Sequence, residues 1–251
     1  MTDHQKFVIL SLPRTGSTYL VDFLDSVDDV RCLSEIFHPT EIDLRHHQPV
    51  DPALLDMKLR DADQLGYLER VEHEIADRRW FGFKHFPRYG LPLMRFLCAS
   101  RDWRKIFLWR DNLLEQYLSH LLAAMHFGRT GWGRVPDEKK LEIPLDALLD
   151  DLHTIEQNYI ELERALLLAG GDGVFSLEYE ELGRAEVLRG MLSFLGLPEA
   201  SIDRAVTRAT AADASPDLRF ERGPRAAQRI QNFDAIHRLL RHTRYRRWLE
   251  D

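Results

Sequence analysis

Residues 7–18 read Phe-Val-Ile-Leu-Ser-Leu-Pro-Arg-Thr-Gly-Ser-Thr, and this stretch decides the fold. Its first five residues form a short, continuous apolar run that stops at a turn, which is typical of a buried parallel strand. After the turn, apolar residues recur at helical spacing, and we expect a helix to begin at Ser17 or Thr18. The recurring residues are Leu20, Val21, Leu24 and Val27. Strand, glycine-containing loop and helix are the start of a βαβ unit.

The rest of the chain continues this alternation. Short apolar runs predict further strands at 31–33, 80–84, 105–109 and 173–177. Helices are expected after Asp111-Asn112, over about 145–169 and near 225–249, whereas residues 40–75 are polar and helical or irregular. We therefore predict one α/β domain over residues 1–251, a three-layer α/β/α arrangement with a central parallel sheet of about five strands.

Composition limits the classes of partner. Hydrophobic residues make up 44% and charged residues 30% of the chain, the balance of a soluble globular protein. The net charge of −7 argues against nucleic acid as the main partner, because proteins that bind the phosphate backbone are usually basic. A small anionic ligand is still compatible, since it needs only local N–H donors and a few arginines.

The two cysteines and the N-terminus indicate the compartment. Cys32 and Cys98 lie in apolar surroundings, so we expect buried free thiols and neither a disulfide nor a metal site. No window approaches the roughly 18 apolar residues that a membrane span requires, which predicts no integral membrane contact. A strand begins after six residues and leaves no room for a signal peptide. We expect a cytoplasmic protein.

The loop at 12–18 has the features of an anion site. A strand-to-helix loop presents free backbone N–H groups and the positive end of the helix dipole. Gly16 lets the backbone approach an anion, Ser17 and Thr18 add hydroxyls, and Arg14 adds a charge. The loop lacks the second glycine and the lysine of a nucleotide-hydrolysing P-loop. It therefore fits a single phosphate carrying sulfate better than a triphosphate; an ordinary capped turn is the alternative.

A second element follows the strand at 105–109. Arg110 stands at the carboxyl end of that strand, the edge at which ligands bind in open parallel sheets, and Ser119 lies about two turns into the next helix. These two residues can meet one phosphate from two sides. The alternative is that Arg110 pairs with Asp111 or Glu115 on the surface and that Ser119 has no role.

At this point the sequence resembles the sulfotransferases that use 3′-phosphoadenosine 5′-phosphosulfate (PAPS), in particular the bacterial branch with trehalose, lipopolysaccharide and nodulation-factor sulfotransferases. Residues 12–18 resemble the family's 5′-phosphosulfate loop, and 110–119 its 3′-phosphate motif. Ser34-Glu35-Ile36-Phe37 is similar to the segment with the acidic catalytic residue, and residues 177–182, including Tyr179, resemble the segment near the adenine. The resemblance implies a P-loop-NTPase-like fold, PAPS as co-substrate, adenosine 3′,5′-bisphosphate as product, and no metal.

Two departures accompany this resemblance. The interval from Arg110 to Ser119 is one residue longer than usual, which puts Asp111 at the family's arginine position. Ser34 replaces the glycine that usually precedes the acid. The C-terminal stretch at 220–225 is loosely similar to the family's Arg-Lys-Gly segment, which implies Arg222 and Gly223 as a further clamp on the 3′-phosphate.

Sulfuryl transfer needs a base for the hydroxyl proton and cations for the leaving phosphate. Glu35 is the first choice for the base, and His85 is its rival because eukaryotic cytosolic sulfotransferases use a histidine after a similar strand. Lys84 and Arg14 are candidates for neutralising the leaving phosphate. The alternatives are a surface carboxylate for Glu35, a structural ring for His85 and a solvated Lys84.

The acceptor side is expected at residues 40–75 and 126–137, where His126, Phe127 and Trp132 suit stacking on a sugar. The resemblance implies a small-molecule or glycan acceptor, of the carbohydrate or glycolipid type, and a homodimer stays open. Two competing functions remain: an ATP-dependent small-molecule kinase, which the missing Gly-Lys-Ser/Thr opposes, and a non-catalytic nucleotide-binding module.

Overall fold

A computed structural model describes residues 4–49, 51–75, 77–127, 140–170, 173–211, 213–215, 218, 220 and 226–249. The chain forms two compact units. Unit 1 comprises Met1–Trp109 and Glu161–Phe220, and unit 2 comprises Arg110–Ile160 and Glu221–Asp251. The single domain over residues 1–251 stays a prediction.

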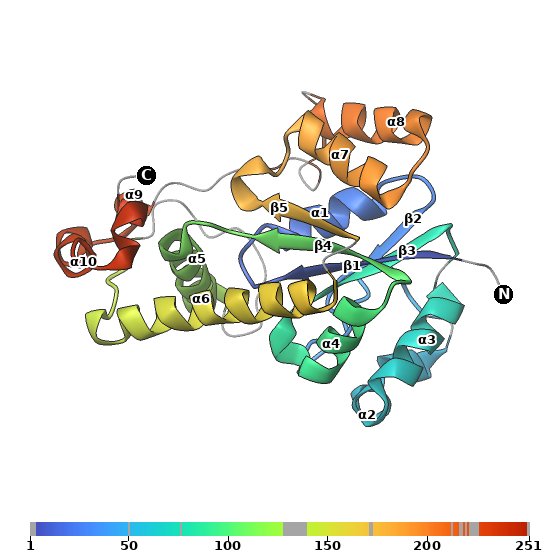
Figure 1. Cartoon of the computed structure of the whole chain (residues 1–251), viewed down its shortest axis with the longest axis horizontal. Coiled ribbons are helices and arrows are strands. Elements are labelled where there is room, and N and C mark those ends of the chain that lie inside the picture. The colour runs from blue at the N-terminus through green and yellow to red at the C-terminus, as the bar shows by residue number, and fades with distance from the viewer. Residues whose placement is uncertain are drawn as a thin grey trace. The chain divides into compact units, whose positions relative to one another are not determined.

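Unit 1 contains a five-stranded sheet in the order β2-β3-β1-β4-β5, with every neighbouring pair parallel (Figure 1). The strands are β1 Gln5–Ser11, β2 Val30–Leu33, β3 Trp80–His85, β4 Trp103–Trp109 and β5 Val174–Glu178. All five agree with the predicted strands to within two residues. Because β1 is central and the chain leaves it toward both edges, the loop after β1 lies at the topological switch point, where open sheets bind ligands.

Helices cover both faces of this sheet. On one face lie α1 Ser17–Asp25, α7 Ala185–Leu195 and α8 Glu199–Thr210, and on the other lie α3 Gln64–Ile75 and α4 Leu91–Ala99 (Figure 1). Alternate strand residues, such as Phe7 and Ile9 of β1, share a buried core with α1 and α7. The short elements of unit 1 are η1 Pro52–Leu55, α2 Met57–Ala62, η2 Pro87–Tyr89 and η3 Tyr179–Glu181. The predicted three-layer α/β architecture is confirmed.

Unit 2 is helical in its described part. It contains α5 Leu113–Phe127, α6 Leu145–Leu168 up to residue 160, α9 Ala226–Arg229, α10 Phe233–Leu240 and η5 Arg244–Leu249. The single helix predicted near 225–249 is wrong, because the segment is divided into three. Asn232 explains the break after α9: its side chain accepts from the Ile143 N–H at 3.0 Å and donates to the Ile143 carbonyl at 2.8 Å.

Cys32 and Cys98 are both buried free thiols, as predicted. Within the described ranges, no helix combines the length and the apolar character needed to cross a membrane.

Candidate functional site

The loop after β1 has the backbone of an anion site. Arg14 (φ 67°) and Gly16 (φ 77°) both adopt left-handed conformations. Gly16 is required here, because a Cβ at this position would come within 2.5 Å of Leu182 Cδ1. The loop is closed by Thr15, whose hydroxyl donates to the Leu12 carbonyl at 2.9 Å.

Helix α1 begins at Ser17, with Gly16 as its N-cap, and no described side chain caps this end. The ordinary capped turn is therefore not what the structure shows. The first N–H groups of a helix have no partner within it, so those of α1 point out of its N-terminus, where the helix dipole is positive. This end of α1 can bind a phosphate or sulfate group.

Lys84 and Glu35 meet next to this loop. Lys84 lies in β3, one position before its end, and Glu35 lies two residues after the end of the neighbouring parallel strand β2. Lys84 Nζ lies 2.9 Å from Glu35 Oε1 and 3.5 Å from Thr18 Oγ1. Both side chains are buried, with exposed fractions of 0% and 1%. The alternatives of a solvated Lys84 and a surface Glu35 are wrong.

The two oxygens of Glu35 have different partners. Oε2 accepts a hydrogen bond from the hydroxyl of Tyr89, at the end of η2. Oε1 is within ion-pair distance of Lys84 Nζ but receives no aligned hydrogen bond from any described residue. A buried carboxylate oxygen without an aligned donor is costly, and here the ammonium of Lys84 is the charge that faces Oε1. We call Thr18, Glu35, Lys84 and Tyr89 the Glu35 cluster.

His85 lies on the other face of the sheet. Successive side chains of a strand point to opposite faces, so Lys84 reaches α1 while His85 does not. The His85 ring is completely buried, with ring centroids 5.8 Å from Phe37 and 6.3 Å from Phe83. Burial lowers the pKa of His85 from 6.5 to about 4, and neither ring nitrogen has a hydrogen-bond partner among the described residues. Tyr89 contacts both candidate bases: its ring centroid lies 6.3 Å from that of His85, and its hydroxyl donates to Glu35.

Arg60 fixes the segment that follows Glu35. Its side chain extends from α2 and is buried, and Nη1 donates to the carbonyls of His38 at 2.6 Å and Glu41 at 3.1 Å. Sequence reasoning missed Arg60 because nothing distinguishes it within a polar stretch. It also missed Tyr89, for which the Pro-Arg-Tyr sequence directly after β3 was an available signal.

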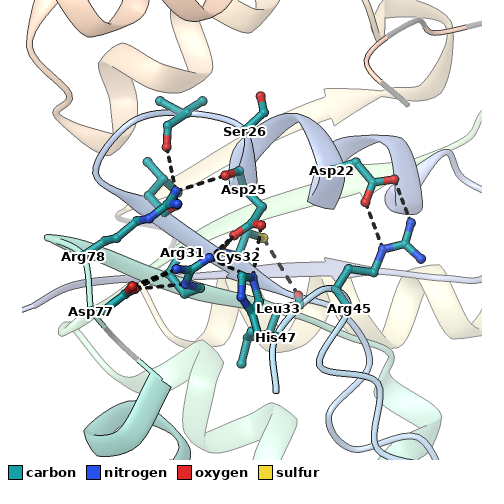
Figure 2. A network of polar contacts seen from close by, with 12 residues as sticks. Asp22, Asp25, Ser26, Arg31, Cys32, Leu33, Arg45, His47, Asp77 and Arg78 are labelled. Atoms are coloured by element: carbon teal, nitrogen blue, oxygen red, sulfur yellow. Dashed lines mark hydrogen bonds and ion pairs between the residues drawn. The ribbon is translucent and has the colours of Figure 1, made fainter. Parts of the chain in front are cut away.

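A second group of paired charges, built around the buried Arg31, lies at the start of β2 (Figure 2). Arg31 Nη1 donates to Asp25 at 3.2 Å, and Nη2 donates to Asp77 at 2.9 Å. His47 Nε2 lies 2.8 Å from Arg31 Nη1 and 3.1 Å from Asp25 Oδ2. Burial lowers the pKa of His47 below its ordinary value. We call Asp25, Arg31, His47 and Asp77 the Arg31 cluster.

The same region attaches the chain after Glu35 to α1. Arg45 donates to both carboxylate oxygens of Asp22, at 2.9 and 2.7 Å (Figure 2). Together with His47, this contact holds residues 45–47 against the C-terminal half of α1. The segment that begins at Glu35 is therefore fixed at several points along its length.

Tyr179 also lies near the loop. A Cβ at Gly16 would be 3.4 Å from Tyr179 Cδ2, so the tyrosine ring closes over that glycine. The ring packs edge-on against Phe220, with centroids 5.2 Å apart. This position next to the loop is compatible with the adenine contact that the resemblance implies.

The predicted 3′-phosphate residues belong to unit 2. Arg110 is buried, its backbone N–H donates to the Tyr159 hydroxyl at 3.2 Å, and its side chain lies 3.8 Å from Glu115. The alternative pairing with Glu115 is thus present. Ser119 lies on α5 and is half-buried. The joint action of Arg110 and Ser119 with the loop of unit 1 stays a prediction.

Several predicted residues lie outside the described part of the chain. Arg222, Gly223 and Trp132 are among them, and only the backbones of His126 and Phe127 are described, at the end of α5. Within the described residues, no cluster of three or more potential metal ligands is found.

The comparisons with known proteins agree with this geometry at the level of the fold. No family model matches the sequence, and a search of curated proteins finds no significant match. Among solved structures, the crystal structure of a sulfotransferase from Alicyclobacillus acidocaldarius is similar, with a TM-score of 0.52 and 15% sequence identity. The similarity covers 98% of this chain and 94% of that one. The chain therefore has the fold of a sulfotransferase.

Proposed function

We propose that this chain is an enzyme that transfers a sulfuryl group from PAPS to a hydroxyl of a carbohydrate or glycolipid-type acceptor, without a metal. The observation that carries the proposal is the buried Glu35–Lys84 pair beside Thr18, at the N-terminus of α1. An anion site, a cation and a carboxylate with one unsatisfied oxygen are the groups that this reaction needs.

The donor's 5′ end binds at the loop of residues 14–18. Arg14 supplies charge, Gly16 allows close approach, and Ser17 and Thr18 contribute backbone N–H groups and hydroxyls at the start of α1. Thr15 has a structural part, since its hydroxyl closes the loop on Leu12. A loop without the P-loop lysine suits one phosphate carrying sulfate.

The rest of the nucleotide engages residues farther along the chain. Arg110 and Ser119 bind the 3′-phosphate, Arg222 and Gly223 close over the same group, and Tyr179 contacts the adenine. The position of the Tyr179 ring beside Gly16 supports the adenine contact, because the adenine and the 5′ end of one nucleotide would then both lie at the loop of residues 14–18.

Glu35 is the general base of the proposed reaction. In the transfer, a bond forms between sulfur and the acceptor oxygen, the bond from sulfur to the 5′-phosphate oxygen breaks, and the hydroxyl proton passes to Glu35 Oε1. Lys84 Nζ lies 2.9 Å from Glu35 Oε1 and, with Arg14, offers positive charge to the leaving phosphate.

His85 does not suit the role of base. Its ring is enclosed by aromatic side chains on the face of the sheet away from α1. With a pKa of about 4, it also has little driving force to accept a proton at neutral pH. We assign it a structural role.

Two measurements test the proposal. Calorimetric titration should detect binding of adenosine 3′,5′-bisphosphate and no comparable binding of ATP, and ATP binding instead would favour the kinase. Transfer of labelled sulfate from PAPS to a glycan panel should give labelled product; nucleotide binding without transfer to any acceptor would favour the non-catalytic module.

Arg14→Ala tests the assignment of the loop. Removing a charged donor from an anion should weaken binding of adenosine 3′,5′-bisphosphate roughly ten- to a hundredfold. Arg95→Ala, at an exposed arginine of α4, is the matched control and should leave the affinity unchanged. Equal affinities of Arg14→Ala and the parent protein would refute the donor site.

Two remaining assignments are part of the proposal. We propose that the protein acts in the cytoplasm, on small-molecule or glycan acceptors and not on nucleic acid. A homodimer is compatible with this function, and sedimentation velocity of the purified protein decides its oligomeric state.

A further inference from the structure

Glu35 is held by two residues of one segment. Lys84 at the end of β3 and Tyr89 at the end of η2 approach different oxygens of the same carboxylate. Glu35 and Tyr89 have exposed fractions of 1% and 8%, so water has little access to their contact. A hydrogen bond to a charged group is strong when it is shielded from solvent.

Tyr89 is itself fixed in place. Its ring lies at centroid distances of 5.2 Å from His38 and 5.3 Å from Phe86, and the guanidinium of Arg88 stands 5.2 Å from its centroid. Arg88 Nη2 also donates to the Tyr89 hydroxyl at 3.3 Å. Among the described residues, Glu35 is therefore the acceptor for the proton of this phenol.

The hydroxyl of Tyr89 acts as a donor and not as a base. Burial, and then the negative charge of Glu35, raise the pKa of Tyr89 well above its ordinary value. The phenol consequently keeps its proton across the working range of pH. Its hydrogen bond occupies Oε2, which leaves Oε1 as the carboxylate oxygen without an aligned donor.

From this geometry we infer that Tyr89 is a positioning residue, which blocks Oε2 of Glu35 and thereby selects Oε1 as the atom that receives the acceptor's proton. The inference rests on the proposed function. The inference assigns to Tyr89 the choice between the two carboxylate oxygens, since only a hydroxyl on the Oε1 side of Glu35 is deprotonated.

The test compares Tyr89→Phe with Tyr67→Phe, a matched control. Tyr67 is a buried tyrosine whose hydroxyl donates to the Leu54 carbonyl at 2.9 Å, away from Glu35. Tyr89→Phe should lower kcat roughly ten- to a hundredfold and leave the Kd of adenosine 3′,5′-bisphosphate unchanged. The acid limb of its pH–kcat profile should move to higher pH, because the ionised carboxylate has lost a donor.

The control separates positioning from packing. Both variants lose one buried hydroxyl, so both should lower the unfolding midpoint, but only Tyr89→Phe should change kcat and its pH profile. If Tyr89→Phe retains the parent's kcat and acid limb, Tyr89 merely packs and the inference is overturned.

A second measurement does not depend on activity. Urea midpoints of Tyr89→Phe, Glu35→Gln and the double variant form a cycle that reports the contact itself. The double variant should lose less than the sum of the single losses, and additive losses would overturn the inference. If the parent transfers no sulfate at all, the proposed function fails, whereas the cycle still decides whether Tyr89 holds Glu35.

Discussion

The Arg31 cluster and the Glu35 cluster lie at opposite ends of β2, and both pair charges of opposite sign; Glu35 and Lys84 are fully buried, whereas the Asp77 side chain is 62% exposed. In the Arg31 cluster, every carboxylate accepts hydrogen bonds from Arg31 or a backbone N–H, and none of its polar atoms is buried without a partner within the described residues (Figure 2). In the Glu35 cluster, Oε1 is left without an aligned donor. The clusters differ in how completely their polar groups are satisfied.

This difference distinguishes a structural cluster from a reactive one. Charges that only hold elements together gain most when each is paired, since any unpaired group costs free energy. A carboxylate that must accept a proton needs one oxygen available to the substrate. Substitutions in the Glu35 cluster should therefore mainly lower turnover, whereas substitutions in the Arg31 cluster should mainly lower stability.

The largest effect is expected from Glu35→Gln. Glutamine keeps the shape but cannot accept the proton, so kcat should fall about 10²- to 10⁴-fold while nucleotide affinity stays the same. The matched change in the other cluster, Asp25→Asn, should leave kcat per folded molecule unchanged. Initial rates with labelled PAPS measure both. Full turnover of Glu35→Gln together with loss of turnover in His85→Ala would reverse the assignment of the base.

Arg31→Leu should have the largest effect on stability. It leaves the buried carboxylate of Asp25 without its cation, which costs about 3 kcal/mol of unfolding free energy. Urea denaturation followed by circular dichroism gives the value. Arg189→Leu is the control, because its ion pairs with Glu199 and Asp203 are exposed and should contribute little. Equal losses in the two variants would contradict a structural role of the Arg31 cluster.

The burial of His85 predicts that the stability of the protein depends on pH. Its pKa is about 4 in the folded protein and 6.5 in the unfolded chain, so the unfolded chain binds more protons between these values. The stability that His85 contributes in its neutral form is fully present above pH 6.5. About 3 kcal/mol of unfolding free energy is lost as the pH falls to 4. His85→Leu should remove this part of the pH dependence.

Urea denaturation at several pH values measures that change. His46→Leu, at an exposed histidine, controls for the loss of one imidazole. If the parent and His85→Leu lost the same stability between pH 6.5 and 4, the histidine would not be buried in its neutral form.

The sequence was sufficient for the features that depend on neighbouring residues. Short segments rich in apolar residues located all five strands, and the position of Glu35 and Lys84 at the ends of two strands placed both at the ligand-binding edge. Their pairing follows from the parallel register of β2 and β3. The alternation of side chains along a strand could also have predicted that Lys84 and His85 point to opposite faces of the sheet.

The features that were missed depend on distant parts of the chain. Tyr89 meets Glu35 across 54 positions, and Arg60 reaches carbonyls about twenty residues before it. The break in the C-terminal helix depends on Asn232 and Ile143, 89 positions apart. Such contacts are set by packing of the folded chain, so a local pattern can mark a residue, as Pro-Arg-Tyr marks Tyr89, but it does not identify the distant partner.

Gly16→Ala should give the smallest loss of stability, and it tests whether the loop backbone contacts the anion. Alanine in the left-handed conformation costs about 1–2 kcal/mol, and its Cβ would contact Leu182. Gly170→Ala is the matched control, because it has a positive φ with nothing within 4 Å of the added Cβ. Both variants should lose stability because alanine is strained at a positive φ, but only Gly16→Ala should also weaken binding of adenosine 3′,5′-bisphosphate. Equal affinity in the two variants would mean that close approach at Gly16 is not part of the anion site, and that the loop binds through Arg14 and the N-terminus of α1 alone.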